Sequence, residues 1–219
     1  MIEEISEIAI KAGHAILEYY KEDVIVERKD DNSPLTKADM AAHYIITDSL
    51  KKLTPDIPII SEEGGVADFD VRKKWERFWL VDPLDGTKEF IKKNDEFTVN
   101  IALIENGNPV IGVVYIPAKD ILYAGHKENG SYKKVNKSDW IRIYSKKPDL
   151  SKPVTVVASR SHGSDDLDEK LTEKGVKIGS KIPAGSSLKF CLVAEGSADI
   201  YPRMGPTMEW DTAAGDAVY

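Results

Sequence analysis

Residues 97–117, FTVNIALIENGNPVIGVVYIP, constrain the fold more than any other part of this chain. Two apolar runs of strand length flank the pair Asn106-Gly107. Both residues tolerate the positive φ angles that a two-residue hairpin turn needs, so the stretch predicts an antiparallel hairpin. The runs DILYAG (120–125) and GSYKKV (130–135) extend this hairpin into a meander. Such a sheet needs other elements to cover its apolar face.

The part of the chain before this hairpin supplies two elements of that kind. Apolar residues recur at helical spacing over residues 2–20 and again over 36–53, which predicts two amphipathic helices. Short strands are expected at 24–29, 57–60 and 78–81, with a turn cluster at 30–34. Up to about residue 145, the sequence therefore predicts two helices against a mostly antiparallel sheet.

After a polar joint that contains Pro148, strands and helices alternate. Strands are expected at 154–159, 176–180 and 198–203, and helices at 165–174, 186–196 and 209–219. This alternation is typical of an α/β layer. We therefore expect an N-terminal α+β subdomain at 1–148 and a C-terminal α/β subdomain at 149–219.

Composition excludes several classes of function. The formal charge of −7 argues against a basic face for nucleic acid. The acidic N-terminal segment does not have the basic, apolar pattern of a signal peptide, and no apolar stretch is long enough to span a membrane. The single cysteine, Cys191, suits a reducing compartment. A cytoplasmic protein without stable membrane insertion is expected.

Acidic residues stand at or just after the ends of several apolar elements, and one stands near the start of a predicted helix. They are Asp39, Glu62, Glu63, Asp82, Asp85 and Asp211. Each alone has an ordinary structural interpretation: an acid stabilised by the dipole at the start of a helix, a residue of a solvated loop, or a turn residue. Their meaning depends on whether they converge.

The stretch DPLDGT, residues 82–87, is harder to explain as a plain turn. Pro83 fixes its own φ angle, so the link between Asp82 and Asp85 is stiff. Two carboxylates and the Leu84 carbonyl then form an all-oxygen set of the kind that Mg²⁺ prefers. Thr87 would begin a helix, whose free N–H groups are a seat for phosphate. The stretch indicates metal-assisted hydrolysis of a phosphate ester.

The motifs SPLTKADMAAH, SEE, DPLDGTKEF and WDTAAGDAV occur in this order and resemble the inositol monophosphatase family of Mg²⁺-dependent, lithium-sensitive phosphatases. Within that superfamily the sequence is most similar to the 3′(2′),5′-bisphosphate nucleotidases of sulfur assimilation. The resemblance runs from about residue 5 to residue 219. It implies an α/β fold built as a five-layer αβαβα sandwich.

The resemblance also implies roles for particular residues. The metal ligands would be Glu62, Asp82, the Leu84 carbonyl, Asp85 and Asp211, and the cofactor would be two or three Mg²⁺. Asp39 and Thr87 would be the catalytic residues that orient the attacking water, with no covalent intermediate. Crowded carboxylates repel one another, so cations are expected among them on physical grounds as well. The backbone amides of Gly86 and Thr87 would bind phosphate.

Three further residues bear on the choice of substrate. Ser186, Lys189 and Arg203 match positions that contact nucleotide phosphates in the resembled enzymes, and two cations suit a second phosphate group. They indicate hydrolysis of adenosine 3′,5′-bisphosphate to AMP and phosphate. Each also has a structural interpretation, as an N-cap, a solvated lysine or a surface arginine. His162 is expected to have no catalytic role.

Two alternatives stay open. One is a phosphatase for inositol 1-phosphate or a sugar phosphate, and the other is a metal- and nucleotide-sensing protein without turnover. The resemblance leaves both a monomer and a homodimer open. Because family members usually continue past WDTAAGDAV with a loop and a strand, an edge of the second subdomain is expected to be missing.

Overall fold

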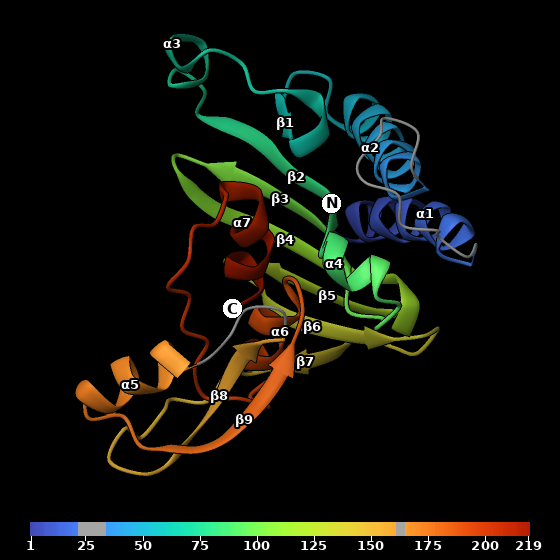
Figure 1. The fold of residues 1–219 in the computed structure, drawn as a ribbon. Coiled ribbons are helices and arrows are strands. Elements are labelled where there is room, and N and C mark those ends of the chain that lie inside the picture. The colour runs from blue at the N-terminus through green and yellow to red at the C-terminus, as the bar shows by residue number, and fades with distance from the viewer. Residues whose placement is uncertain (22–33, 161–164) are drawn as a thin grey trace.

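Two sheets and the helices around them make up the computed structural model, which describes residues 1–21, 34–160 and 165–219 (Figure 1). The large sheet contains β1 (Ile59–Ser61), β2 (Arg77–Asp85), β3 (Thr98–Glu105), β4 (Asn108–Ile116), β5 (Ile121–His126), β6 (Gly130–Val135) and β7 (Ile141–Ile143). The small sheet contains β8 (Val154–Ser159) and β9 (Ile178–Ala184). The helices are α1 (Ile2–Tyr20), α2 (Pro34–Leu53), α3 (Phe69–Arg72), α4 (Thr87–Ile91), α5 (Asp165–Glu173), α6 (Leu188–Ala194) and α7 (Glu209–Val218), with 3₁₀ turns η1 (Glu62–Gly64) and η2 (Pro117–Lys119).

The predicted hairpin forms the centre of the large sheet. Asn106 and Gly107 have φ angles of 49° and 75° and join β3 to β4. The described strands of the large sheet lie side by side in sequence order, and in that sheet only the β1–β2 pair is parallel. The meander prediction is therefore confirmed for β3 to β6.

The elements stack in five layers, which confirms the predicted fold class. Side chains alternate along β2, so Trp79 and Val81 face α1 and α2 while Leu80 faces the opposite side. On that opposite side α6 and α7 form the third layer, followed by the small sheet and then by α5 (Figure 1). Each boundary between layers holds apolar side chains, so the chain has a continuous series of cores.

Helix α7 lies very close to the large sheet. A Cβ atom at Gly112 of β4 would come within 2.3 Å of the carbonyl oxygen of Ala214, and one at Gly125 of β5 within 2.1 Å of that of Ala217. Only glycine fits at such a distance between a strand and a helix backbone. These two glycines therefore set the position of α7, the helix that carries Asp211.

Several predicted boundaries need correction. Strand β2 does not end at residue 81 but continues through Asp85. The predicted strand at 198–203 is wrong, because in this segment only Ile200 forms a bridge, to Val156 of β8. The short strand β7 was not expected, and α2 begins at Pro34 rather than at residue 36. The strand predicted at 24–29, most of the turn at 30–34 and His162 lie outside the described residues.

The division of the chain near residue 148 is a proposal. The small sheet and α5 form a separate apolar cluster, which favours it. Helix α7, in contrast, contacts β2, β3, β4 and β5 of the large sheet. If the two subdomains are real, their border is thus a shared core rather than a flexible joint.

Candidate active site

The end of β2 carries the two acids of the DPLDGT stretch. Asp82 pairs with Asn100 of β3 and Asp85 pairs with Thr98, with a register shift between the two pairs. Pro83 lies in this irregular stretch, where its missing N–H costs the sheet little. An irregularity of this kind changes the direction in which side chains point. The strand therefore presents its last acids toward the C-terminal helices.

The Asp85 carboxylate is held by hydroxyl and amide groups from neighbouring elements. Its Oδ2 accepts hydrogen bonds from Ser187 Oγ at 3.1 Å, Asn100 Nδ2 at 3.4 Å and Thr98 Oγ1 at 3.5 Å. Ser187 Oγ also lies 2.8 Å from the carbonyl oxygen of Asp211, and Asn100 donates to Ser187 Oγ at 2.9 Å. These contacts join β2, β3, the start of α6 and α7 at one point.

Burial and mutual repulsion dominate the electrostatics of the acids. Burial raises the pKa of Asp82 well above its usual value, and the charges of Asp85, Glu62 and Asp39 raise it further. Asp82 is only 1% exposed. Burial also raises the pKa of Glu62, against a hydrogen bond with Asp82. For Asp85, burial and Asp211 raise the pKa while Lys189 lowers it. The fold thus gathers carboxylates that disfavour each other's ionisation.

The chemistry of these groups suits hard divalent cations. Oxygen donors are available from Glu62, Asp82, Asp85, Asp211 and the backbone of Leu84, and cations would offset the repulsion among the acids. In the part of the chain that the structure describes, no three His, Cys, Asp or Glu side chains are already arranged to hold a metal ion. The donor types nevertheless fit a hard divalent cation such as Mg²⁺.

The two predicted catalytic residues lie on neighbouring helices. Asp39 is buried on α2 and is close enough to Asp82 to raise its pKa. Thr87 is the first residue of α4, and it follows Gly86, whose φ angle is 94°. Helices α2 and α4 contact each other. The structure thus brings both residues to the edge of the acidic cluster.

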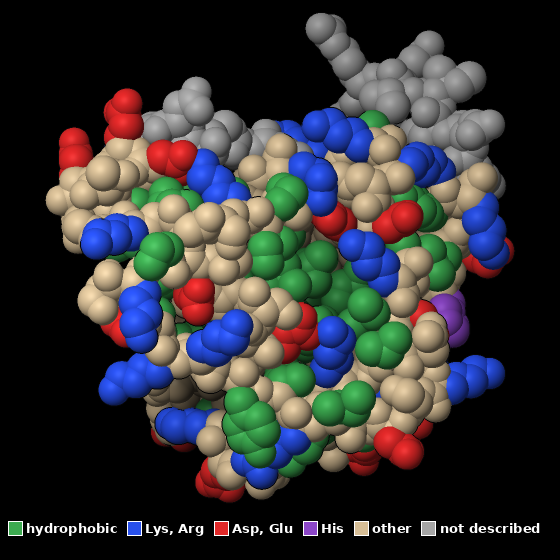
Figure 2. Space-filling model, turned by 90° about the horizontal axis from the view of Figure 1, so that it is seen from below, with side chains coloured by type: hydrophobic (Ala, Val, Ile, Leu, Met, Phe, Trp, Pro, Cys, Tyr) green, Lys and Arg blue, Asp and Glu red, His purple; other side chains and the backbone are tan. Residues whose placement is uncertain are grey.

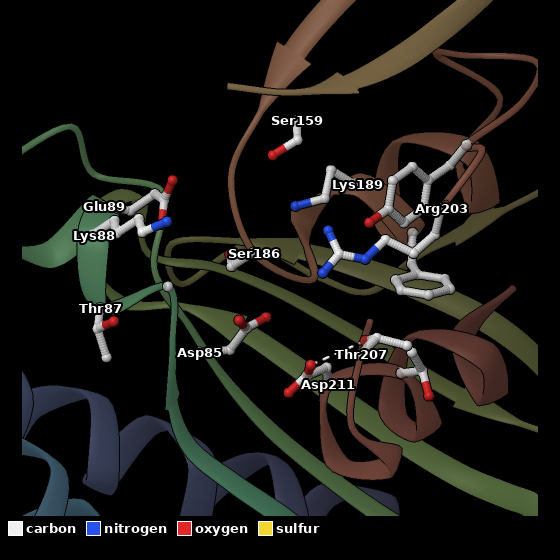
Figure 3. Close-up of a pocket in the computed structure, with 14 residues that line it drawn as sticks. Asp85, Thr87, Lys88, Glu89, Ser159, Ser186, Lys189, Arg203, Thr207 and Asp211 are labelled. Carbon is white, nitrogen blue, oxygen red and sulfur yellow. Dashed lines mark hydrogen bonds between the residues drawn. The ribbon is translucent and has the colours of Figure 1, made fainter. Parts of the chain in front are cut away.

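A pocket of about 220 Å³ opens beside the acids. Its lining consists of Asp85, Gly86, Thr87, Lys88, Glu89, Ser159, Ser186, Lys189, Phe190, Tyr201, Arg203, Thr207, Asp211 and Thr212. The lining includes most of the predicted site residues, but Asp39, Glu62, Asp82 and Leu84 are not part of it. Figure 3 shows Asp85 and Asp211 on one side of the pocket and Lys189 and Arg203 on the other.

Polar contacts hold the acidic and basic sides in place. Asp211 Oδ2 accepts hydrogen bonds from Thr207 Oγ1 and from the Met208 N–H, each at 2.9 Å. Lys189 is only 6% exposed, and burial lowers its pKa while the charge of Asp85 opposes the shift. Arg203 donates to the Pro206 carbonyl at 2.7 Å. A polyanionic ligand would therefore meet acids at one end and cations at the other.

The sequence interpretation missed Thr98, Asn100 and the hydroxyl of Ser187 as supports of Asp85. Asn100 carried a usable signal, because it is a polar residue within the apolar run of β3, where a buried amide needs partners. Thr98 carried none, since threonine is common in strands. Ser187 is the N-cap residue of α6, but its hydroxyl contacts Asp85 and Asp211 instead of making a side-chain cap hydrogen bond.

Charged side chains of both signs lie on one face of the described part of the molecule. On the face seen in Figure 2, basic and acidic side chains are interspersed and do not form a basic patch. That face therefore gives no support to nucleic-acid binding. None of the helices among the described residues has the length and apolar character needed to cross a bilayer.

Comparisons with known proteins show which family this chain resembles. The model of the inositol monophosphatase family matches residues 1–219. The 3′(2′),5′-bisphosphate nucleotidase CysQ of Salmonella typhimurium (strain LT2) is 50% identical over 220 residues, which cover 100% of this chain and 86% of that protein. CysQ of Escherichia coli (strain K12) is 49% identical over the same shares.

Solved structures show the same fold. The crystal structure of CysQ from Bacteroides thetaiotaomicron superposes with a TM-score of 0.84 at 41% identity and covers 99% of this chain and 84% of that one. An inositol monophosphatase from Anabaena gives a TM-score of 0.78 at 24% identity, covers 99% of this chain and 79% of that one, and supports the fold alone. The motifs, the layered fold and these matches lead to one conclusion: the chain belongs to the inositol monophosphatase family.

Proposed function

We propose that this protein is a metal-dependent phosphatase that removes the 3′-phosphate of adenosine 3′,5′-bisphosphate and releases AMP and phosphate. The observation that carries the proposal is the two-sided pocket, with Asp85 and Asp211 facing Lys189 and Arg203. A substrate with one phosphate needs only the acidic side and its metals. A substrate with two phosphates uses both sides. The relatives named as 3′(2′),5′-bisphosphate nucleotidases, at about half identity, support the same substrate class.

The acidic side would hold the metal. Family membership supports metal dependence, and the hard oxygen donors favour Mg²⁺, of which we propose two or three. The proposed ligands are Glu62, Asp82, the Leu84 carbonyl, Asp85 and Asp211. Bound Mg²⁺ supplies positive charge that activates water and stabilises the charge that develops on the phosphate oxygens.

The protein's own groups handle the proton and orient the phosphate. The Thr87 hydroxyl and the Asp39 carboxylate lie at the edge of the acidic cluster, and we assign them the proton that the attacking water loses. Gly86 and Thr87 line the pocket next to Asp85, so their N–H groups are suited to bind the phosphate that is cleaved. No side chain needs to become phosphorylated.

The basic side would bind the phosphate that is not cleaved. Lys189 and Arg203 provide charge, and the Ser186 hydroxyl lines the same part of the pocket. Because Lys189 is buried, its interaction with a phosphate is less screened by water than a surface contact would be. This side therefore contributes binding energy and selectivity, while the acidic side contributes the chemistry.

Two further assignments are also proposals. A cytoplasmic location is supported by the single, buried and free Cys191. A homodimer and a monomer both remain compatible with the described residues. Sedimentation of the purified protein at several concentrations distinguishes the two states.

A substrate panel tests the proposed function. Phosphate release is measured for adenosine 3′,5′-bisphosphate, adenosine 3′-monophosphate and inositol 1-phosphate, with Mg²⁺ or with a chelator, and with increasing Li⁺. The expected result is the highest kcat/KM for the bisphosphate, loss of turnover in chelator and inhibition by Li⁺. Faster turnover of inositol 1-phosphate would identify the alternative phosphatase. Binding of the bisphosphate without phosphate release would identify a sensor.

A further inference from the structure

The loop that joins α4 to β3 is strained and firmly held. Lys93 and Asp95 have φ angles of 53° and 64°, in the left-handed region that residues other than glycine rarely adopt. Tyr20 of α1 donates to Asp95 Oδ1 at 2.7 Å, and the Glu96 N–H donates to Asn94 Oδ1 at 3.2 Å. Strain of this kind persists only where the surroundings enforce it, and it often marks a functional position.

The loop presents Glu96, whose carboxylate is the centre of a buried ionic cluster. Its side chain accepts two hydrogen bonds from the Arg160 guanidinium, each at 2.9 Å, and lies 3.6 Å from Lys119 Nζ. The Gly185 N–H donates to Glu96 Oε2 at 2.9 Å. Burial alone would raise the pKa of Glu96, but Arg160, Lys119 and the Gly185 N–H outweigh it and lower the pKa. The carboxylate is therefore ionised and fully engaged.

The backbone of Glu96 holds the next residue of the same turn. The Ser186 hydroxyl donates to the Glu96 carbonyl oxygen. Ser186 has a φ angle of 42°, so this turn between β9 and α6 is itself strained. A Cβ atom at Gly185 would lie 2.4 Å from Glu89 Cγ, so the turn is packed against α4 as well. Glu96 thus holds two successive residues of one turn.

That turn determines where the basic side of the pocket lies. Ser186 lines the pocket, and Lys189 follows in the first turn of α6. The described lining of the pocket does not include Glu96, which lies behind the turn. Any change in the turn would move Ser186 and Lys189 relative to Asp85, which lies on β2 and is held from β3 by Asn100 and Thr98 as well as by Ser187.

We propose that Glu96 is a positioning residue that fixes the 185–186 turn and thereby sets the preference for substrates that carry a second phosphate. This inference rests on the proposed function, because it assigns the second phosphate to Ser186 and Lys189. Glu96 acts through these residues and does not touch the substrate. Its loss affects binding of the second phosphate and leaves the chemistry at the acidic side intact.

The test compares Glu96→Gln with Glu105→Gln. The control breaks an ion pair of the same kind, between Glu105 and Arg77 at 2.7 Å, in a part of the sheet that does not line the pocket. With Glu96→Gln we expect KM for adenosine 3′,5′-bisphosphate to rise about tenfold, the effect of losing one charged hydrogen bond. Its kcat and both parameters for adenosine 3′-monophosphate should stay near wild type. Glu105→Gln should change none of these values.

A second variant shows whether the effect of Glu96→Gln arises from a folding defect. Arg160 is half exposed, so Arg160→Gln removes the main partner of Glu96 without opening a buried site. Arg160→Gln should also raise KM for adenosine 3′,5′-bisphosphate, and the double variant should raise this KM no further than Glu96→Gln alone. Equal rises in KM for both nucleotides, or a fall in kcat alone, would overturn the positioning role.

The outcomes also separate the two proposals. A wild type that hydrolyses the bisphosphate, with Glu96→Gln indistinguishable from Glu105→Gln, overturns only the role of Glu96. A wild type that binds the bisphosphate without hydrolysis overturns the proposed function, and calorimetric Kd values then measure the effect of Glu96. If the wild type neither binds nor hydrolyses the bisphosphate, both proposals are wrong.

Discussion

The acidic and basic ends of the pocket are built from different kinds of structure. Asp82 and Asp85 lie at the end of β2, where the strand pairs with β3 and helices cover both faces of the sheet. Ser186 and Lys189 follow β9, which pairs only with β8 among the described residues, and Arg203 lies in an irregular segment. The acids are therefore fixed by the large sheet, whereas the cations depend on turns and on groups such as Glu96.

This difference suits the tasks that we propose for the two ends. Metal ligands must hold their positions within a fraction of an ångström, which favours a central strand. Recognition of a second phosphate tolerates more movement, because charge acts over a longer range than coordination does. Substitutions at the acidic end should therefore lower kcat, and those at the basic end should raise KM.

The largest effect is expected for Asp82→Asn. Loss of this carboxylate removes a proposed metal ligand, and a cost of about 4 kcal/mol in transition-state stabilisation corresponds to roughly a 1000-fold fall in kcat. Because burial and nearby acids raise the pKa of Asp82, its ionised form destabilises the fold at neutral pH. The variant should thus keep the wild-type Tm, or exceed it, in chelator.

Phosphate release and thermal unfolding measure these two outcomes. The exposed Asp56→Asn serves as the control and should match wild type in both. Full activity in Asp82→Asn would refute the assignment of Asp82 as a metal ligand.

A smaller effect is expected at the basic end, with Lys189→Met. Methionine keeps the packing of the buried side chain and removes its charge. Loss of a charged contact worth about 2 kcal/mol should raise KM for adenosine 3′,5′-bisphosphate roughly 30-fold. Steady-state kinetics with adenosine 3′-monophosphate provide the control, since its KM should hardly change. A similar loss with both nucleotides would mean that Lys189 serves the acidic end instead.

Gly112→Ala tests whether the large sheet positions Asp211 through α7. The new methyl group would collide with the α7 backbone, and such overpacking costs about 1–3 kcal/mol of unfolding free energy. Denaturant titration measures this loss. Because α7 would shift, kcat should fall more than KM rises. Gly107→Ala offers a control without steric conflict, although its positive φ adds strain. An unchanged kcat in Gly112→Ala would show that Asp211 tolerates movement.

The smallest effect is a dependence of stability on pH at Glu96. Its pKa is lower in the folded protein, so its ionised form adds stability above the unfolded value of about 4.3. This stability is lost as the pH falls through the lower folded value. The difference in Tm between wild type and Glu96→Gln should therefore be largest near neutral pH and vanish in acid. A difference that stays constant from neutral pH to strong acid would refute an ionic role.

Sequence patterns predicted what local interactions determine. The hairpin at Asn106-Gly107 and the helices α1 and α7 follow from turn chemistry and apolar periodicity. The predicted end of β2 is wrong because Pro83 and two acids resemble a turn, whereas β3 continues to pair with the strand as far as Asp85. The strand expected at 198–203 failed because Ile200 alone finds a partner there.

The candidate site divides in the same way. The acids of β2 could be predicted from their spacing and from the family resemblance. The cluster around Glu96 could not, because it depends on Arg160 and Gly185, which are distant in sequence and carry no shared motif. Contacts between residues so distant in sequence can be identified only from the folded structure.

The close fit of α7 against β4 and β5 has a consequence for biosynthesis. Asp211 reaches the pocket only after this late helix has been made and has closed onto strands formed much earlier. A chain whose synthesis has not yet reached α7 lacks Asp211, one of the proposed metal ligands. On the proposed function, turnover therefore requires the long-range contacts between α7 and the large sheet, which form more slowly than local contacts.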